Sequence, residues 1–536
     1  MADVTLAERT YSRAKSLKTS RIVWDDHYQD LADYMLPRKN SIIQKKTSGD
    51  KRNDVIYDGT ALQAVDLLAA SLHGMLTSPS VPWFELSAGS PELDGNYQIK
   101  EWLEETTNIL RMYFSQSNFN MEIHEAYIDL VVFGTAAMYS EFTDNKLRFS
   151  TRHISEFFIT EDNHGRVDSL YRWYNEPARI VVQRFGLENI GERITKIYSK
   201  EPDQEVPVIH AVFPRDEYDA TKIDTLNKPY ESLFLDGENG TLISQGGFDE
   251  FPYVVPRFLK STGESYGRSV AMNALPDVKM LNLMSKTIIM ASQKQIDPPL
   301  LVPDDGFALP IRTTPASINF YRAGGRDTIQ PLNTQANIPL GLNMEDQRRA
   351  AIRSAFFVDQ ILSGREPNMT ATEVLQRNEE RMRVLGPVLG RLTDELLRPL
   401  IDRCFALLDR AGLIPPAPQI LEGQNINIEY VSPMARAAKS SGLNSTMQAL
   451  QMLMPLAETQ PIMDYINGDG IVRHVVESLG VPSRVIRSDA EVRKMRKERA
   501  EQQAEMEEKQ QLQEDVYTAA QAGQAMTNVS NATTKE

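Results

Sequence analysis

Apolar residues in the first 140 positions recur every three or four residues, the spacing that places them on one face of an α-helix. The pattern predicts four helices, at about 6–35, 58–74, 98–114 and 121–138. Pro37 ends the first helix, because proline has no backbone N–H to donate. Asp58 is a favourable N-cap residue for the second helix. The chain therefore begins with a helical region.

Short segments of alternating apolar and polar residues replace this pattern between about 139 and 260. They predict strands at 147–151, 156–160, 167–173, 206–213 and 230–235, a further strand after the turn at 236–240, and one short helix at 178–185. Strands joined by such short turns pair in antiparallel fashion. We therefore expect an α+β fold with a mostly antiparallel sheet, and not the alternating order of a doubly wound fold.

Two amphipathic helices follow, at about 269–295 and 343–361, separated by a proline-rich stretch. One face of the first helix is polar and basic, and it carries Lys279, Asn282, Lys286 and Gln293. Its opposite face is apolar, with Met280, Leu281, Met284, Ile288 and Ala291. The second helix combines the same two kinds of residue: Arg348, Arg349 and Arg353 beside Ile352 and Phe356. The pattern predicts a helical hairpin with a projecting tip.

Two capping boxes introduce the C-terminal helices. Thr370 and Glu373 begin a helix that extends to about residue 411, with a kink at Gly386-Pro387. Smaller helices are predicted within 443–480. Ser488 and Glu491 begin a charged, glutamine-rich helix that ends near residue 520, and the last dozen residues are predicted to be disordered.

The composition is that of a globular protein, since 41% of the 536 residues are hydrophobic and 24% are charged. The single cysteine, Cys404, excludes a disulfide framework and a cysteine-based zinc site. A net charge of −15 argues against a protein that simply coats DNA. The seven histidines lack metal-ligand spacing, and neither a P-loop nor a dinucleotide fingerprint is present. We expect no cofactor and no metal.

The most apolar run, residues 130–139, is about half the roughly 20 residues that a membrane-spanning helix needs. The charged N-terminus does not resemble a signal peptide. We therefore expect a soluble, intracellular protein without membrane partners.

Residues 263–267, GESYG, match the G-x-S-x-G nucleophile elbow of α/β-hydrolases. A serine hydrolase centred on Ser265 is thus one hypothesis. It is weak, because His474 is the only histidine after Ser265 and no segment resembles an oxyanion hole. The alternative is a glycine-flanked turn from sheet into helix. A third hypothesis is an intracellular scaffold whose basic hairpin binds an acidic partner.

The sequence resembles the portal proteins, which are the head-to-tail connectors of short-tailed bacteriophages. The most specific match is residues 263–269, GESYGRS, before the first long helix. Residues 130–139, LVVFGTAAMY, and 370–374, TATEV, support it. The resemblance covers about 5–480 and implies a structural protein without a catalytic site.

The resemblance also implies a division of the chain. The expected parts are an N-terminal wing at 1–268, a first stem helix at 269–296, a clip at 297–339, a second stem helix at 340–357, a tunnel loop and second wing part at 358–437, a crown at 438–487, and a charged helix with a flexible tail at 488–536. Such proteins form a ring, usually of twelve copies, at one capsid vertex of the virion. The ring is assembled in the host cytoplasm.

Double-stranded DNA passes through this ring without sequence specificity, and the implied protein partners are the terminase packaging motor, a tail adaptor, and the capsid and scaffolding proteins. Acidic walls with few basic residues suit a conduit, because many phosphate contacts would hold DNA fast. The candidate channel residues are Lys279, Lys286, Arg353, Arg365 and Asn368. The candidate stem interface residues, apolar and expected to bury against a neighbouring subunit, are Leu281, Met284, Ile288, Ile352 and Phe356.

Overall fold

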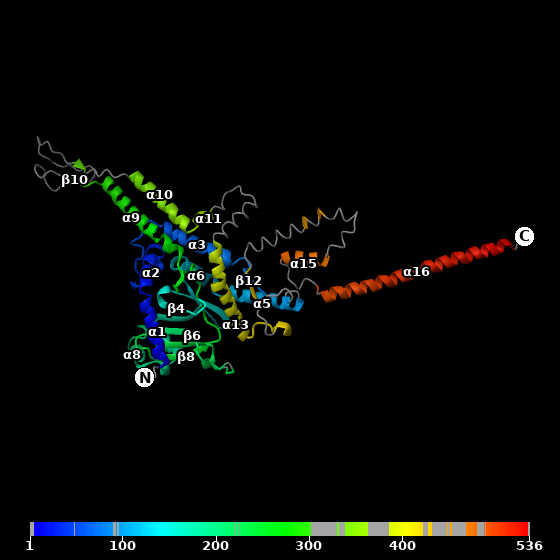
Figure 1. Cartoon of the computed structure of the whole chain (residues 1–536), viewed down its shortest axis with the longest axis horizontal. Helices are drawn as coiled ribbons and strands as arrows, with labels where there is room; N and C mark the ends of the chain where they lie inside the picture. Colours follow the sequence, from blue (N-terminus) through cyan, green and yellow to red (C-terminus); the bar gives the residue numbers. More distant parts are fainter. Residues whose placement is uncertain are drawn as a thin grey trace. The chain divides into compact units, whose positions relative to one another are not determined.

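The computed structural model describes residues 5–47, 49–88, 93, 96–219, 221–222, 224–301, 330–331, 338–362, 385–421, 427–430, 447–448, 451–452, 468–479, 487 and 489–533 (Figure 1). The chain divides into two compact units. The first contains Met1–Phe84, Ile109–Ile414 and Tyr430–Met434, and the second contains Glu85–Asn108, Pro415–Glu429 and Ala435–Glu536. Arg365, Asn368, the Thr370 capping box and most of the predicted clip and crown lie outside the described residues.

The helical N-terminus consists of α1 (Leu6–Ser20), α2 (Ile22–Met35), α3 (Thr60–Leu76), α5 (Tyr97–Gln116) and α6 (Phe119–Phe133). The single helix predicted over 6–35 is divided into two at Arg21, a one-residue turn whose N–H still bonds to the Leu17 carbonyl oxygen. The buried Arg21 guanidinium donates hydrogen bonds to the carbonyl oxygens of Ile154 and Phe157, so this position packs against the body. Gly59, rather than Asp58, is the N-cap of α3.

Two antiparallel sheets form the middle of the first unit. The larger has the order β4 (Phe157–Glu161), β5 (Val167–Pro177), β6 (Glu205–Pro214), β7 (Tyr230–Asp236) and β8 (Leu242–Phe248). The smaller has the order β3 (Lys146–Arg152), β2 (Ala137–Thr143) and β9 (Tyr253–Val254). The predicted α+β class with antiparallel strands is confirmed. Residues 137–138 belong to β2 and not to a helix, because Gly134 ends α6 with a left-handed φ of 75°.

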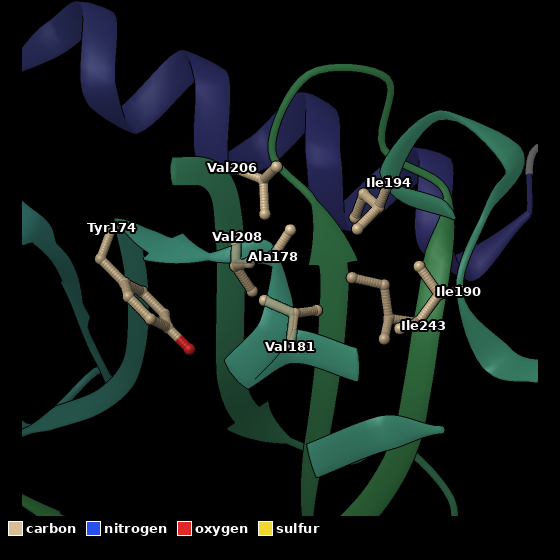
Figure 2. Close-up of a cluster of buried hydrophobic side chains, with 8 residues drawn as sticks. All are labelled: Tyr174, Ala178, Val181, Ile190, Ile194, Val206, Val208 and Ile243. Carbon is tan, nitrogen blue, oxygen red and sulfur yellow. The ribbon is translucent and has the colours of Figure 1, made fainter. Parts of the chain in front are cut away.

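Both faces of the five-stranded sheet are covered, since successive side chains of a strand point to opposite faces. Figure 2 shows one cluster, in which α7 (Ala178–Phe185), α8 (Glu192–Lys200) and the strands meet. Its buried members are Tyr174, Ala178, Val181, Ile190, Ile194, Val206, Val208 and Ile243. Helix α1 packs on the other face through Ala14, against Phe158, Tyr171, Ile209, Ala211, Leu233 and Leu235. This sandwich of helices and sheet is the core of the first unit, which, apart from the helical hairpin, we call the body.

The helical hairpin consists of α9 (Val270–Ile296) and α10 (Ile338–Ala355), which pack side by side (Figure 1). The helix predicted at 343–361 is two helices, because Phe357 adopts a φ of 58° between α10 and α11 (Val358–Leu362). Residues 385–392 are helical and continue through the π-helical turn Thr393–Leu397 into α13 (Arg398–Arg410).

The second unit contains α15 (Gly468–Leu479) and α16 (Asp489–Thr533). Helix α16 continues beyond the predicted end near 520, through an alanine- and glutamine-rich segment with good helix propensity. The remaining elements are short. The strands are β1 (Phe84–Ser87), β10 (Leu300–Leu301), β11 (Gln330–Pro331) and β12 (Asn427–Tyr430), and the 3-10 helices are η1 (Pro37–Lys39), η2 (Ile154–Glu156), η3 (Leu187–Asn189), η4 (Thr225–Asn227) and η6 (Gln419–Leu421).

Candidate functional site

The two sequence motifs that carried the resemblance meet in the structure, at a place we call the motif junction (Gly134 and Gly267). A Cβ atom at Gly134 would lie 2.5 Å from the carbonyl oxygen of Gly267, and a Cβ atom at Gly267 would overlap the carbonyl oxygen of Gly134. The Gly267 amide donates to the hydroxyl of Thr135 at 2.8 Å. Ser269 caps α9 and donates to the carbonyl oxygen of Val132 at 2.8 Å. The junction therefore fixes where α9 leaves the body.

Three other side chains of residues 263–269, those of Glu264, Tyr266 and Arg268, make structural contacts. Glu264 forms an ion pair with Arg268, whose guanidinium lies 4.5 Å from the ring centre of Trp24. The buried Tyr266 hydroxyl accepts a hydrogen bond from the backbone N–H of Ile159. The neighbouring strands are antiparallel, whereas a nucleophile elbow follows a strand of the parallel sheet in α/β-hydrolases. The turn is structural, and no observation favours hydrolase chemistry at Ser265.

A buried ionic cluster holds the same region to the helix at 385–410. The side chain of Arg257 is 2% exposed and forms ion pairs with Glu161 and with Glu395, the latter at 2.9 Å. It also donates to the carbonyl oxygens of Gly165 and Ser265. Burial alone would lower the pKa of Arg257, but the hydrogen bonds and charges of Glu395 and Glu161 raise it. This cluster joins segments about 100 residues or more apart in sequence.

The hairpin is held by an inner face on each helix. Leu281 is buried, Ile288 lies against Gly341, and the Ser285 hydroxyl donates to the buried Glu345 carboxylate at 2.7 Å. The predicted stem interface stays a prediction. Leu281, Ile352 and Phe356 are already buried within the single chain, while Met284 and Ile288 are partly buried. The apolar faces of the two amphipathic helices are thus buried largely within one chain.

Residues 53–58, which we call the strap, bind along the hairpin. The Asn282 side chain accepts from the Tyr57 amide and donates to the Val55 carbonyl oxygen, both at 2.6 Å. Arg349 donates to Asp58 at 2.9 Å, and Asp58 also accepts from the Thr60 amide. Burial alone would raise the pKa of Asp58, but the hydrogen bonds from Thr60 and Arg349 hold it below its usual value. The strap therefore links α3, α9 and α10.

Three of the six cations on α9 and α10, Lys279, Arg348 and Arg349, form ion pairs within the described chain. Lys279 forms an ion pair with Asp30 at 2.6 Å, and Arg348 forms one with Asp277 at 2.9 Å. Lys286 lies 5.5 Å from the ring centre of Tyr57, and no carboxylate of the described chain pairs with it. Arg353 is exposed and has no partner among the described residues. Of the three predicted channel residues that the structure describes, Lys286 and Arg353 retain unpaired charges.

Each helix also has an outer face, which lies on the opposite side of the helix axis from its inner face. On α9, Leu283 is 65% exposed and Met290, two turns later, is 49% exposed. On the C-terminal half of α10, the exposed outer residues are small or polar, namely Gln347, Ala350, Ala351 and Ser354, whereas its first turns also expose Leu340 (58%) and Met344 (42%). Because the helices pack side by side through their inner faces, the apolar outer face of α9 and the small outer face of α10 point away from each other.

Sequence reasoning missed the strap and the Arg257 cluster. Both depend on contacts between distant segments, such as Tyr57 with Asn282 or Arg257 with Glu395. The one local indication of the strap was Asn282 in the basic sector of α9, because an amide side chain can both donate to and accept from the backbone of another segment.

The sequence of this chain is similar to known bacteriophage proteins along nearly its whole length. Residues 7–486 match the family model described as bacteriophage head to tail connecting protein. The chain belongs to this family. It is 32% identical over 546 residues to the probable portal protein of Bordetella phage BPP-1, covering 100% of this chain and 98% of that relative. It is 31% identical to the portal protein of Salmonella phage epsilon15, covering 92% and 91%. Identity to the portal protein of Escherichia phage T7 is 23%, covering 77% and 76%.

Family membership gives the chain a structural role as a portal, or connector, in a bacteriophage. The predicted resemblance and function are confirmed by these matches. Within the part of the chain that the structure describes, no helix is both long and apolar enough to cross a membrane. The described histidine, cysteine and acidic residues form no group of three suited to a metal ion.

Proposed function

We propose that copies of this chain close into a ring, twelve by the family resemblance, whose hairpins surround a channel for double-stranded DNA. The observation that carries this proposal is the pair of unlike outer faces on the hairpin. Leu283 and Met290 of one copy pack against Ala350, Ala351 and Ser354 of the next. Contact between unlike faces is heterologous, and repeated contacts of this kind generate a closed ring when the rotation closes.

Lys286 and Arg353 lie on one side of each hairpin and face the DNA. Lys286 contacts the strap, and Arg353 follows one turn after Arg349, which also contacts the strap. Two cations per chain in a protein of net charge −15 give few phosphate contacts, which lets any DNA sequence pass without being held. Lys279 is a weaker candidate, because Asp30 neutralises it. Arg365 and Asn368 remain candidates for the tunnel loop.

The parts of the ring follow the family resemblance. The body at 1–268 and 358–437 forms the wing with the tunnel loop, 269–296 and 340–357 form the stem, 297–339 the clip, 438–487 the crown, and 488–536 a charged extension. The clip binds the terminase motor and later the tail adaptor, and the wing contacts capsid and scaffolding proteins. The ring occupies the portal vertex of the virion after assembly in the host cytoplasm. It has no catalytic activity, and ATP hydrolysis belongs to the motor.

The channel role is tested by reversing charge at Arg353 or Lys286. Arg353→Glu and Lys286→Glu should leave annular particles visible by electron microscopy, but should lower the yield of DNA-filled heads about tenfold or more, because a phosphate contact becomes a repulsion. Lys146→Glu, an exposed reversal on the β2–β3 turn, is the matched control and should package normally. Normal packaging by the two hairpin variants contradicts the channel assignment, and solitary chains at every concentration contradict the ring.

A further inference from the structure

A layer of aromatic and basic side chains lies between the two sheets of the body, away from the hairpin. Across the larger sheet, Arg172 on β5 stands directly opposite His210 on β6, which stands opposite Phe234 on β7. The His210 ring stacks on Phe234 at 4.1 Å between ring centres. Tyr253 of the smaller sheet covers this row, and its hydroxyl hydrogen-bonds to His210 at 2.9 Å. The row is thus enclosed between strands.

Three arginines surround this row, each with its guanidinium against an aromatic ring. Arg172 lies 3.7 Å from the ring centre of Tyr174, Arg184 lies 4.7 Å from that of Phe234, and Arg152 lies 5.6 Å from that of Tyr139. A guanidinium that rests on an aromatic face keeps the N–H groups at its edge available for an oxyanion. The stacking therefore holds three cationic donors in fixed orientations.

The charges of these arginines are incompletely balanced within the chain. Glu156 pairs with Arg172 at 2.9 Å. No carboxylate among the described residues lies within ion-pair distance of Arg152 or Arg184, and the buried Nε of Arg152 has no hydrogen-bond partner. Burial, and then the charge of Arg172, lower the pKa of Arg152. Arg184 is exposed, so the cost of an unpaired, partly buried guanidinium falls on Arg152, and a bound counter-ion would offset it.

The buried histidine adds no positive charge. Burial first, and then the charges of Arg184, Arg172 and Arg152, lower the pKa of His210 far below its usual value. The imidazole is therefore neutral and links Tyr253 to Ser232 through its two nitrogen atoms. The strand register and the ring contacts place all three arginines around His210. Arg172 stands opposite it, and Arg184 lies over Phe234, which stacks on it. Arg152 lies over Tyr139, whose ring centre is 6.4 Å from that of His210.

We propose that Arg152, Arg172 and Arg184 form a binding site for a phosphate-type oxyanion, either inorganic phosphate or a phosphate group of a nucleic acid. Phosphate suits the site better than a carboxylate, because it carries more charge and more acceptor oxygens for the two unpaired guanidinium groups. Two other carboxylates lie in the same neighbourhood as the arginines. Glu141 and Glu176 lie near Tyr139 and Tyr174, and one oxygen of Glu176 is buried without a partner. The site does not depend on ring closure.

The test uses the full-length protein and compares sodium phosphate with sodium chloride at equal ionic strength. Phosphate at ten times its dissociation constant should raise the wild-type melting temperature by about 3 °C. Arg152→Gln should weaken phosphate binding, measured by titration calorimetry, about tenfold or more. In chloride the same variant should melt no lower than wild type, because it removes an uncompensated charge. The wild type should therefore melt at the higher temperature in phosphate, and the variant should melt at an equal or higher temperature in chloride. Only a bound anion predicts this change of order.

Arg184→Gln, at a more exposed position, provides a second variant with the same expected loss of phosphate binding. The matched controls are Arg148→Gln and Arg179→Gln, whose arginines lie on the same β3 strand and α7 helix but pair with Asp144 and Asp203. A short DNA duplex distinguishes the sources of phosphate. Affinity lost in Arg152→Gln and competed by inorganic phosphate assigns the site to nucleic acid, and unchanged DNA affinity assigns it to the free ion.

Three results would overturn the proposal. One is equal melting in phosphate and chloride. Another is an equal loss of phosphate affinity in the two control variants, which would indicate nonspecific attraction. The third is that phosphate dissociates oligomers of the wild type but not those of Arg152→Gln. An acidic side chain of a second copy would then be the natural occupant of the site.

Discussion

The motif junction and the outer faces of the hairpin differ in whether their polar and apolar groups have partners within the chain. At the junction, polar groups find partners within the chain, and two backbone segments approach so closely that Gly134 and Gly267 exclude any side chain. On the outer faces of the hairpin, Leu283 and Met290 stay exposed and Arg353 stays unpaired. A site that only has to fold satisfies its own groups. A site that contacts other molecules leaves apolar surface and charge for them.

This contrast separates two kinds of position that look alike in the sequence. Leu281 and Leu283 are both apolar residues of α9, yet one is buried against the chain itself and the other faces outward. Substitutions in the body and on inner faces should therefore change the free energy of unfolding. Substitutions on outer faces should change assembly. The following predictions test this division, beginning with the largest expected effect.

Gly267→Ala should destabilise the body by about 3 kcal/mol or more, because its new Cβ overlaps the Gly134 carbonyl oxygen and backbone on both sides must move. Gly263→Ala is the control. Gly263 has a φ of 83°, but no atom lies within 4 Å of an added Cβ, so only the left-handed conformation costs about 1–2 kcal/mol. Urea unfolding followed by circular dichroism measures both. Equal losses would mean that close approach at the junction is unimportant.

Arg257→Met should cost about 3 kcal/mol, because it leaves Glu161 and Glu395 without their buried cation. Arg391 also pairs with Glu395 but is more exposed, so Arg391→Met should cost less than about 1 kcal/mol. Chemical denaturation of the two variants gives the comparison. If both variants lose the same stability, the cluster does not depend on burial.

Leu283→Asp should change the unfolding free energy of the single chain by less than about 0.5 kcal/mol, since the side chain is 65% exposed. It should nevertheless abolish or greatly reduce ring formation, seen by size-exclusion chromatography with light scattering. Leu281→Ala on the same helix should do the reverse and cost about 2–5 kcal/mol of stability. Intact rings in Leu283→Asp would remove the outer face of α9 from the interface.

Periodicity predicted most of the body. The segment at 178–185 is α7 with the same bounds, and the strands predicted at 167–173, 206–213 and 230–235 are β5, β6 and β7. The errors occur where one residue overrides the pattern. Arg21 divides the first helix and binds distant carbonyl oxygens, and Phe357 breaks the helix after α10. Helix α8 was missed, because its nine residues carry only two aliphatic side chains, Ile194 and Ile197, beside Tyr198.

By itself, the sequence determined the element types, the antiparallel α+β class, the hairpin and the family, because these depend on local spacing and on short motifs. The tertiary structure alone decided which face of each hairpin helix is inner, which cations are neutralised, and where Arg257, Arg152 and the strap find or lack partners. The physical reason is that a charge or an apolar face acquires its role from what lies within a few ångströms of it. Those neighbours come from segments that the linear order keeps far apart.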